Sequence, residues 1–194
     1  MPSAPDTLAP ARNLEIKVAC GGDGLAGVVA RLADLGTSVG ERLAQVDTYF
    51  RVLHGRLKLR TIAHARGDES TGPLIRAELI GYERTDRDSS RWSSYRVVVI
   101  SPEEADTLRT VLASTIGVLV TVTKRRDIAI AGQTRIHLDR VEGLGSFIEL
   151  ETVISTQSDV EAATEHRHVA DALGLGRWPT VPGSYSDLLL AANA

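Results

Sequence analysis

Polar and apolar side chains alternate along most of this chain, in short runs that are typical of β-strands. Glycines and short polar stretches separate the runs, which favours antiparallel pairing of neighbouring strands. The predicted strands are residues 13–20, 45–53, 56–64, 74–84, 93–100, 118–130, 134–141 and 146–154. Eight is a common number of strands for closure into a barrel.

Apolar residues at helical spacing predict helices near both ends of the chain and one between the fifth and sixth strands. They lie at 24–35, 103–116 and 159–173, and a short one falls within 183–192. The polar stretches 65–73 and 85–91 are predicted to be loops by composition. The expected fold class is therefore α+β, an eight-stranded antiparallel β-barrel with flanking helices.

Composition narrows the class of protein. The 194 residues suit one domain, and a single cysteine excludes a disulfide framework and a multi-cysteine zinc site. A net charge of -3 and 4% aromatic residues argue against general nucleic-acid binding. No apolar run approaches the ~20 residues of a spanning helix. We expect a cytoplasmic protein that binds neither nucleic acid nor membrane.

The first residues, MPSAPDTLAPAR, contain three prolines and no apolar run. This composition is that of a flexible tail and not of a signal peptide. We therefore divide the chain into a disordered tail at 1–12 and one domain at 13–194, which includes the C-terminal helices.

Charged residues recur at every second position of the predicted strands, and side chains at this spacing share a face. The shared faces carry Asn13, Glu15 and Lys17; Arg56, Lys58 and Arg60; Arg76, Glu78, Tyr82 and Arg84; Lys124 and Arg126; Arg135, His137 and Asp139; and Glu149 and Glu151. The opposite faces are aliphatic. A barrel with a dry interior would bury the aliphatic faces itself and leave the charges outside. If the helices cover them instead, the charges point inward, and periodicity does not choose between these arrangements.

Cations and anions are segregated by strand. The basic groups Arg56/Lys58/Arg60 and Lys124/Arg126 have no carboxylate on their own strand faces, and Glu149/Glu151 has no cation. Such segregation suits a polyanion bound by the cations while carboxylates hold a divalent metal. Hard oxygen ligands favour Mg²⁺ or Mn²⁺.

The N-terminal strand, NLEIK at 13–17, resembles the Glu-x-Glu-x-Lys signature of the CYTH superfamily, the triphosphate tunnel metalloenzymes. That superfamily includes class IV adenylyl cyclases, thiamine triphosphatases and inorganic triphosphatases. Further similar blocks follow in the family's order: QVDTYF, GRLKLR, AELIGYER, VTKRR and TRIHLDRVEGLGSFIELE, and the closing GSYSDLL resembles the tail of cyclase-like members. The resemblance implies an eight-stranded tunnel whose charged face points inward.

The resemblance also implies roles for individual residues. Metal-binding carboxylates would be Glu15, Glu149 and Glu151, joined by Asp139. Phosphate contacts would be Lys17, Lys58, Arg60, Arg84, Lys124, Arg126 and Arg135, and Lys17 and Glu15 would be the catalytic residues. The implied activity is metal-dependent chemistry on a nucleoside or other organic triphosphate, either cyclisation or hydrolysis. A homodimer is compatible with this fold.

Two positions depart from the family's pattern. Asn13 replaces the first glutamate of the signature, and Ala129 stands where relatives often carry tyrosine. These departures keep two alternatives open. One is the same tunnel recruited to a different phosphorylated or anionic substrate in a specialised pathway. The other is a non-catalytic module that binds a polyphosphate or a nucleotide.

Overall fold

The computed structural model describes residues 12–66, 70–84 and 93–193. Its strands are β1 (Arg12–Cys20), β2 (Glu41–Phe50), β3 (Arg56–Arg66), β4 (Ser70–Arg84), β5 (Ser93–Ile100), β6 (Val118–Ala131), β7 (Thr134–Val141) and β8 (Gly145–Ile154). Its helices are α1 (Gly22–Arg31), α2 (Ala105–Ile116), α3 (Asp159–Leu173) and α4 (Tyr185–Ala192), with 3₁₀ turns η1 (Leu32–Leu35) and η2 (Leu175–Arg177). Apart from Arg12, which begins β1, the predicted tail lies outside the described residues, and so does the loop predicted at 85–91.

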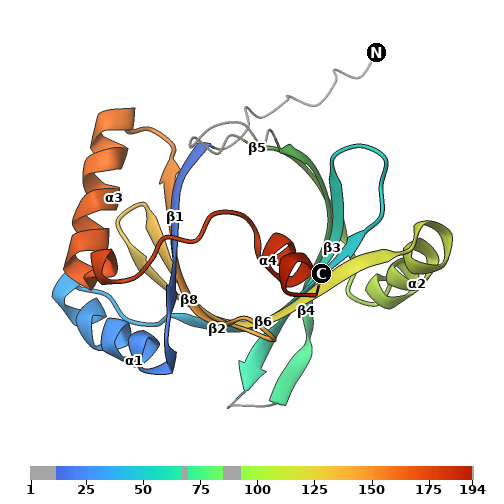
Figure 1. The fold of residues 1–194 in the computed structure, drawn as a ribbon, viewed down its shortest axis with the longest axis horizontal. Coiled ribbons are helices and arrows are strands. Elements are labelled where there is room, and N and C mark those ends of the chain that lie inside the picture. Colours follow the sequence, from blue (N-terminus) through green and yellow to red (C-terminus); the bar gives the residue numbers. More distant parts are fainter. Residues whose placement is uncertain (1–11, 67–69, 85–92, 194) are drawn as a thin grey trace.

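The eight strands form one antiparallel sheet in the order β1-β8-β7-β6-β2-β3-β4-β5. The sheet curls round until its two end strands approach each other, so that the strands form a ring in Figure 1. Within the described ranges no hydrogen-bonded pairing joins β1 to β5, and the ring therefore has a seam there. The predicted antiparallel eight-stranded architecture is confirmed, with curling in place of full hydrogen-bonded closure.

The stretch 65–73 was wrongly predicted to be a loop throughout. Strand β3 continues to Arg66 and β4 begins at Ser70, with Ala65 paired to Thr71. The two strands extend beyond the ring as a projecting hairpin (Figure 1). In this hairpin the strands are held by backbone hydrogen bonds, and their side chains are mostly polar and face water. A polar composition of this kind is typical of loops, so it did not predict strands.

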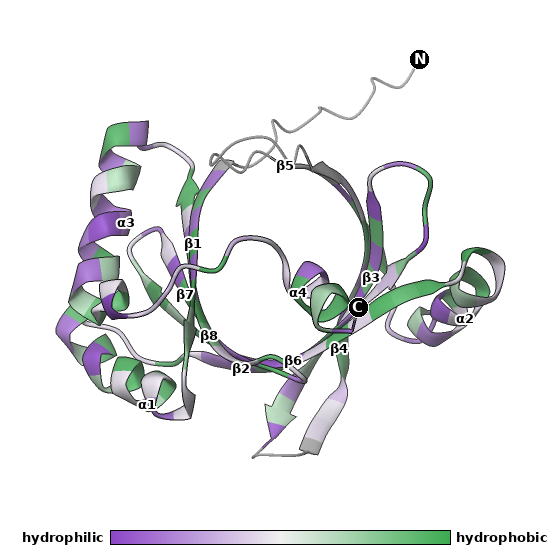
Figure 2. Ribbon diagram, in the orientation of Figure 1, coloured by the Kyte–Doolittle hydropathy of each residue, from purple (hydrophilic) through white to green (hydrophobic). Residues whose placement is uncertain are grey.

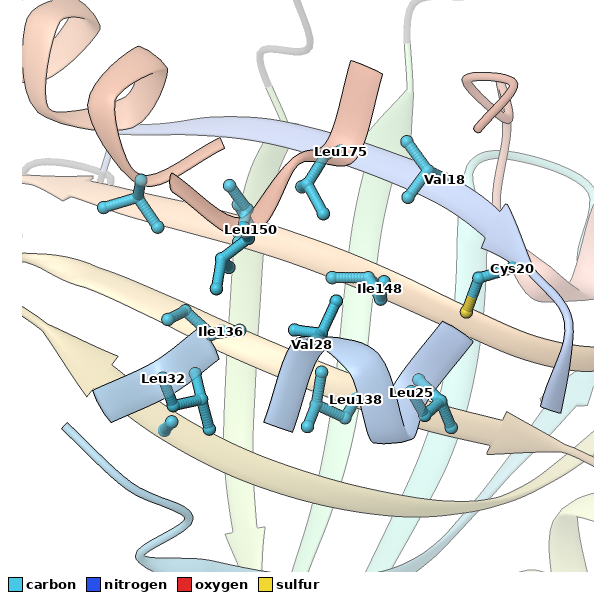
Figure 3. Close-up of a cluster of buried hydrophobic side chains, with 13 residues drawn as sticks. Val18, Cys20, Leu25, Val28, Leu32, Ile136, Leu138, Ile148, Leu150 and Leu175 are labelled. Carbon is cyan, nitrogen blue, oxygen red and sulfur yellow. The ribbon is translucent and has the colours of Figure 1, made fainter. Parts of the chain in front are cut away.

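Aliphatic side chains on one side of the sheet are buried beneath α1 and α3. The main cluster contains Val18, Ile136, Leu138, Ile148 and Leu150 from strands, Leu25, Val28 and Leu32 from α1 and η1, and Val169, Leu173 and Leu175 from α3 and η2 (Figure 3). Burying each such side chain contributes roughly 1.5–3 kcal/mol. Because α1 and α3 lie outside the ring in Figures 1 and 2, the opposite side of the sheet faces inward. We call that side the inner face.

The C-terminal segment crosses from the outside of the ring to its interior. Ala19 N donates to Pro179 O at 3.2 Å and Val181 N donates to Lys17 O at 2.8 Å, so the segment runs along the free edge of β1. Helix α4 then lies within the ring in Figure 1. A second apolar cluster packs α4 against the inner face: Tyr49, Val122, Val141, Phe147 and Tyr185, flanked by Leu188 and Leu189. One end of the inner face is thus covered by α4.

Over the described ranges, none of the helices combines the length and the apolar character needed to cross a membrane.

Candidate anion-binding and metal-binding site

Alternate residues of each strand project from the inner face, and the pairing register aligns them across neighbouring strands. Two aligned rows are Glu15–Glu151–Arg135 and Lys17–Glu149–His137. Two more are Lys124 with Gln45, and Arg60 with Asp47 and Glu78. The period-two alternation of the sequence therefore places most of the predicted site residues on one concave surface.

Asp139 is the centre of one buried ionic cluster. Arg126 donates from Nε to Oδ1 and from Nη2 to Oδ2 of Asp139, both at 2.6 Å, and Nη2 also donates to Glu149 at 2.8 Å. Lys124 Nζ lies 3.5 Å from Oδ2, and Tyr185 Oη donates to the same oxygen at 2.8 Å. Burial raises the pKa of Asp139, but Arg126 and Lys124 outweigh it and lower the pKa to about 2.

Asp47 is the centre of a second buried cluster, which sequence analysis did not assign. Lys58 Nζ lies 3.0 Å from Oδ2, and Arg60 donates from Nε at 2.8 Å and from Nη2 at 3.1 Å. Gln45 Nε2 also donates to Asp47. Burial raises the pKa of Asp47, yet the two cations hold it well below its usual range. The signal in the sequence was the polar alternation Gln45-Val46-Asp47, which belongs to the inner face.

The chain contains three lysines, and all three lie buried on the inner face: Lys17, Lys58 and Lys124. Lysine is among the residues least often buried, because its charged form loses solvation. Burial lowers the pKa of Lys58, and burial together with the neighbouring Arg126 lowers the pKa of Lys124 to about 8. The surface of this protein takes its positive charge from arginine, whereas ammonium groups are confined to the inner face.

Tyr185 of α4 joins the two sides of the site. Lys17 Nζ lies 4.3 Å and Lys124 Nζ 5.0 Å from the centroid of its ring, which is within cation–π range. The ring also packs edge-on against Phe147, and Lys17 Nζ donates to Gly183 O at 3.1 Å. Tyr185 was not singled out as a site residue from the sequence, although the SYSDLL block that contains it was noted.

A second link fixes α4 to the inner face. Arg56 Nη2 lies 2.8 Å from Asp187, and its Nη1 donates to Ser184 Oγ at 3.1 Å. Asp187 and Ser184 also form the capping box of α4. Burial raises the pKa of Asp187, but Arg56 and the Ser184 backbone lower it to about 2. Arg56 thus holds the N-terminal end of α4 against the inner face.

Oxygen atoms that could bind a divalent metal lie at the other end of the inner face. Glu15 and Glu151 are paired across β1 and β8, and Asn13 Nδ2 donates to Glu151 at 2.5 Å. Asn13 Oδ1 is buried without a hydrogen-bond partner. As the side chains lie, no three His, Cys, Asp or Glu residues of the described part form a metal cluster. The orphaned amide oxygen beside two carboxylates nevertheless fits a hard cation.

Arg135 lies apart from these clusters, whereas Asp139 is inside one. Arg135 is half-exposed and contacts Glu151 at 3.2 Å. Arg84 ends β4, but its side chain lies outside what the structure describes. Both oxygens of Asp139 are engaged by cations and Tyr185, so Asp139 orients Arg126 in this arrangement. His137 Nδ1 lies 3.7 Å from Glu149, beyond hydrogen-bonding distance, and burial lowers its pKa.

The fold and this charged inner face are those of the tunnel class anticipated from the NLEIK block. The chain belongs to the CYTH domain family, which it matches over residues 11–185. No functionally curated protein matches it.

Solved structures share the fold at low sequence identity. The PH1012 protein of Pyrococcus horikoshii OT3 superimposes with a TM-score of 0.67 at 22% identity, covering 91% of this chain and 98% of that one. A candidate adenylate cyclase from Vibrio parahaemolyticus gives 0.62 at 17% identity, covering 93% and 99%. A candidate adenylate cyclase from Bacillus halodurans gives 0.55 at 16%, covering 89% and 94%. At these identities the likeness shows the fold.

Proposed function

We propose that this protein is a metal-dependent enzyme that acts on a nucleoside or other organic triphosphate bound at the inner face. The observation that carries the proposal is the placement of all three lysines of the chain, buried, on that face. A protein that needed only structural ion pairs would have no reason to confine ammonium groups to one surface. CYTH membership supports a triphosphate substrate and a divalent metal.

Two arginines are pre-oriented to grip phosphate oxygens. Arg60 and Arg126 each use Nε and Nη2 to bind a buried aspartate. No hydrogen bond from either Nη1 to another described residue is formed, so both groups retain donors for a ligand. A guanidinium that is already held by a carboxylate loses little rotamer entropy on binding. Together with Lys58 and Lys124 they would neutralise the charge that develops during phosphoryl transfer.

The carboxylate end of the inner face would hold the metal. Glu15 and Glu151 supply hard oxygens, with Asn13 Oδ1 beside them and Glu149 in the next row. When bound, Mg²⁺ or Mn²⁺ would neutralise phosphate charge and act as a Lewis acid. Asn13 provides an oxygen without a charge, so this end has one negative charge fewer than the Glu-x-Glu-x-Lys pattern provides.

A lysine can hold or release a proton during the reaction. Lys17 was the sequence-based candidate, and its Nζ lies 3.5 Å from Glu149. Lys124 has its pKa lowered to about 8, so a fraction of its amine is neutral near physiological pH. We therefore propose that Lys124 shares this role with Lys17, because a general base works best when its pKa is near the working pH.

Turnover of a panel of triphosphates with Mg²⁺ or Mn²⁺, followed by phosphorus NMR, tests the proposal. Pyrophosphate with a cyclic nucleotide would identify a cyclase, and orthophosphate would identify a hydrolase. Lys124→Ala should abolish turnover. Arg140→Ala, which removes a half-exposed cation from the outer side of β7, should keep it. Binding of triphosphates without turnover of any of them would contradict the proposed enzyme and favour a binding module.

A further inference from the structure

The inner face is not uniformly charged, because aliphatic side chains stand among the polar ones on its β4–β5 side. Ile80 of β4 is paired with Val97 of β5, and Lys58 of β3 is paired with Ile80, so all three share the inner face. Val99 lies two residues on from Val97 and projects to the same side. Val99 is paired with Glu78 of β4, and the charge of Glu78 is neutralised by an ion pair with Arg76.

These valines are open to solvent although they face inward. Val97 is 49% and Val99 71% exposed, whereas the adjoining Ile80 is only 4% exposed. Figure 1 places β5 across the ring from β2, β6 and β8, whose Asp47, Arg126 and Glu149 belong to the two ionic clusters. The concave surface therefore has a charged wall and, facing it on β5, an accessible aliphatic wall formed by Val97 and Val99.

We propose that the substrate is amphiphilic: a phosphate ester whose organic group is apolar and lies against Val97, Val99 and Ile80 while its phosphates bind the charged wall. This inference rests on the proposed function and specifies its substrate class. Inorganic polyphosphate would leave the valines exposed to water, and a polar sugar would gain little from them. An alkyl or aryl group would remove apolar surface on both sides from water.

The valines are then specificity residues, and their effect depends on the organic group alone. A fully buried methylene strengthens binding about fourfold, so a chain half-buried against one wall should gain about twofold per methylene. From a methyl to a hexyl ester the dissociation constant should fall about thirtyfold. Tripolyphosphate, which has no organic group, should bind alike to the wild type and to variants of this wall.

Isothermal titration of the full chain in EDTA with tripolyphosphate and with methyl, butyl and hexyl triphosphate tests this directly. We expect the thirtyfold gain in the wild type, a gain of under tenfold in Val99→Ser, and an unchanged affinity for tripolyphosphate in both. Val98→Ser is the matched control. It makes the same change one residue away on the outer side of β5, and it should keep the full gain.

Other results overturn the inference in distinguishable ways. If tripolyphosphate binds but hexyl triphosphate binds no tighter than methyl triphosphate, the aliphatic wall does not select the substrate and the proposed function stands. If tripolyphosphate binds neither in EDTA nor in a parallel titration with Mn²⁺, the proposed function fails as well. If Val99→Ser alters the sedimentation coefficient and leaves the chain-length dependence intact, the β5 wall contacts a second copy of the chain instead.

Discussion

Removing the guanidinium of Arg126 should destabilise the protein more than any other single cation replacement. Arg126 makes three charge-assisted hydrogen bonds, at 2.6, 2.6 and 2.8 Å, to two carboxylates. In Arg126→Ala both carboxylates stay buried without their main counter-ion. Breaking a buried pair in this way costs roughly 3–5 kcal/mol. At an m-value of about 2 kcal/mol/M, the urea midpoint should fall by about 1.5–2.5 M.

Arg135→Ala is the matched control, because it breaks a half-exposed pair with Glu151 and should cost only about 0–1 kcal/mol. A double variant separates charge from packing. Arg126→Ala with Asp139→Asn removes one uncompensated charge, so it should be more stable than Arg126→Ala alone. Urea unfolding followed by circular dichroism measures all three. A double variant no more stable than the single one, or an Arg126→Ala cost below about 1 kcal/mol, would refute the electrostatic reasoning.

Three further predictions concern the ligand sites and α4. The affinity for tripolyphosphate should fall as pH rises above about 8, because Lys124 loses its charge there, and Lys124→Arg should remove that fall in a calorimetric titration series. Glu151→Gln should abolish metal-dependent turnover while circular dichroism stays unchanged, and retained metal dependence would exclude Glu151 as a ligand. Asp187→Asn should weaken the link to Arg56 and the α4 cap, at about 1 kcal/mol for the cap, with faster amide exchange in α4 as the readout. In the wild type the contribution of Asp187 is complete above the ordinary aspartate pKa and is lost as pH falls towards about 2.

The sequence was sufficient for the number and order of the strands and for the grouping of their side chains, while the bounds of β2 and β4 differ from those predicted. Arg135, His137 and Asp139 share a face by period-two alternation, and the structure confirms that grouping. Alternation separates the two faces of a strand, but it does not tell which of the two the helices cover. That depends on α1, whose Leu25 and Val28 pack against Leu138 and Ile148 more than 100 residues away. The resemblance to the CYTH superfamily implied that the charged face points inward and that the helices cover the aliphatic one.

Ionic partners across strands were harder to foresee. Arg60 and Arg126 have no carboxylate on their own strand faces, and this pattern indicated segregation of charge. In the folded chain the register brings Asp47 opposite Arg60 and Asp139 opposite Arg126. Tyr185 reaches Asp139 across 46 residues of sequence, through a segment that turns back into the ring. Contacts of this kind follow from the topology and have no local signal.

The most direct test of a polyanion site at the inner face uses the placement of the lysines. Because Lys17, Lys58 and Lys124 are the only lysines of the chain, amine-reactive labelling followed by peptide mass spectrometry reports on the inner face alone, once the N-terminal amine is set aside. Tripolyphosphate with Mn²⁺ should slow acetylation of all three lysines severalfold. Equal molar sulfate, a smaller anion, should protect them far less. Labelling rates unchanged by tripolyphosphate at every lysine would contradict a polyanion site at the inner face.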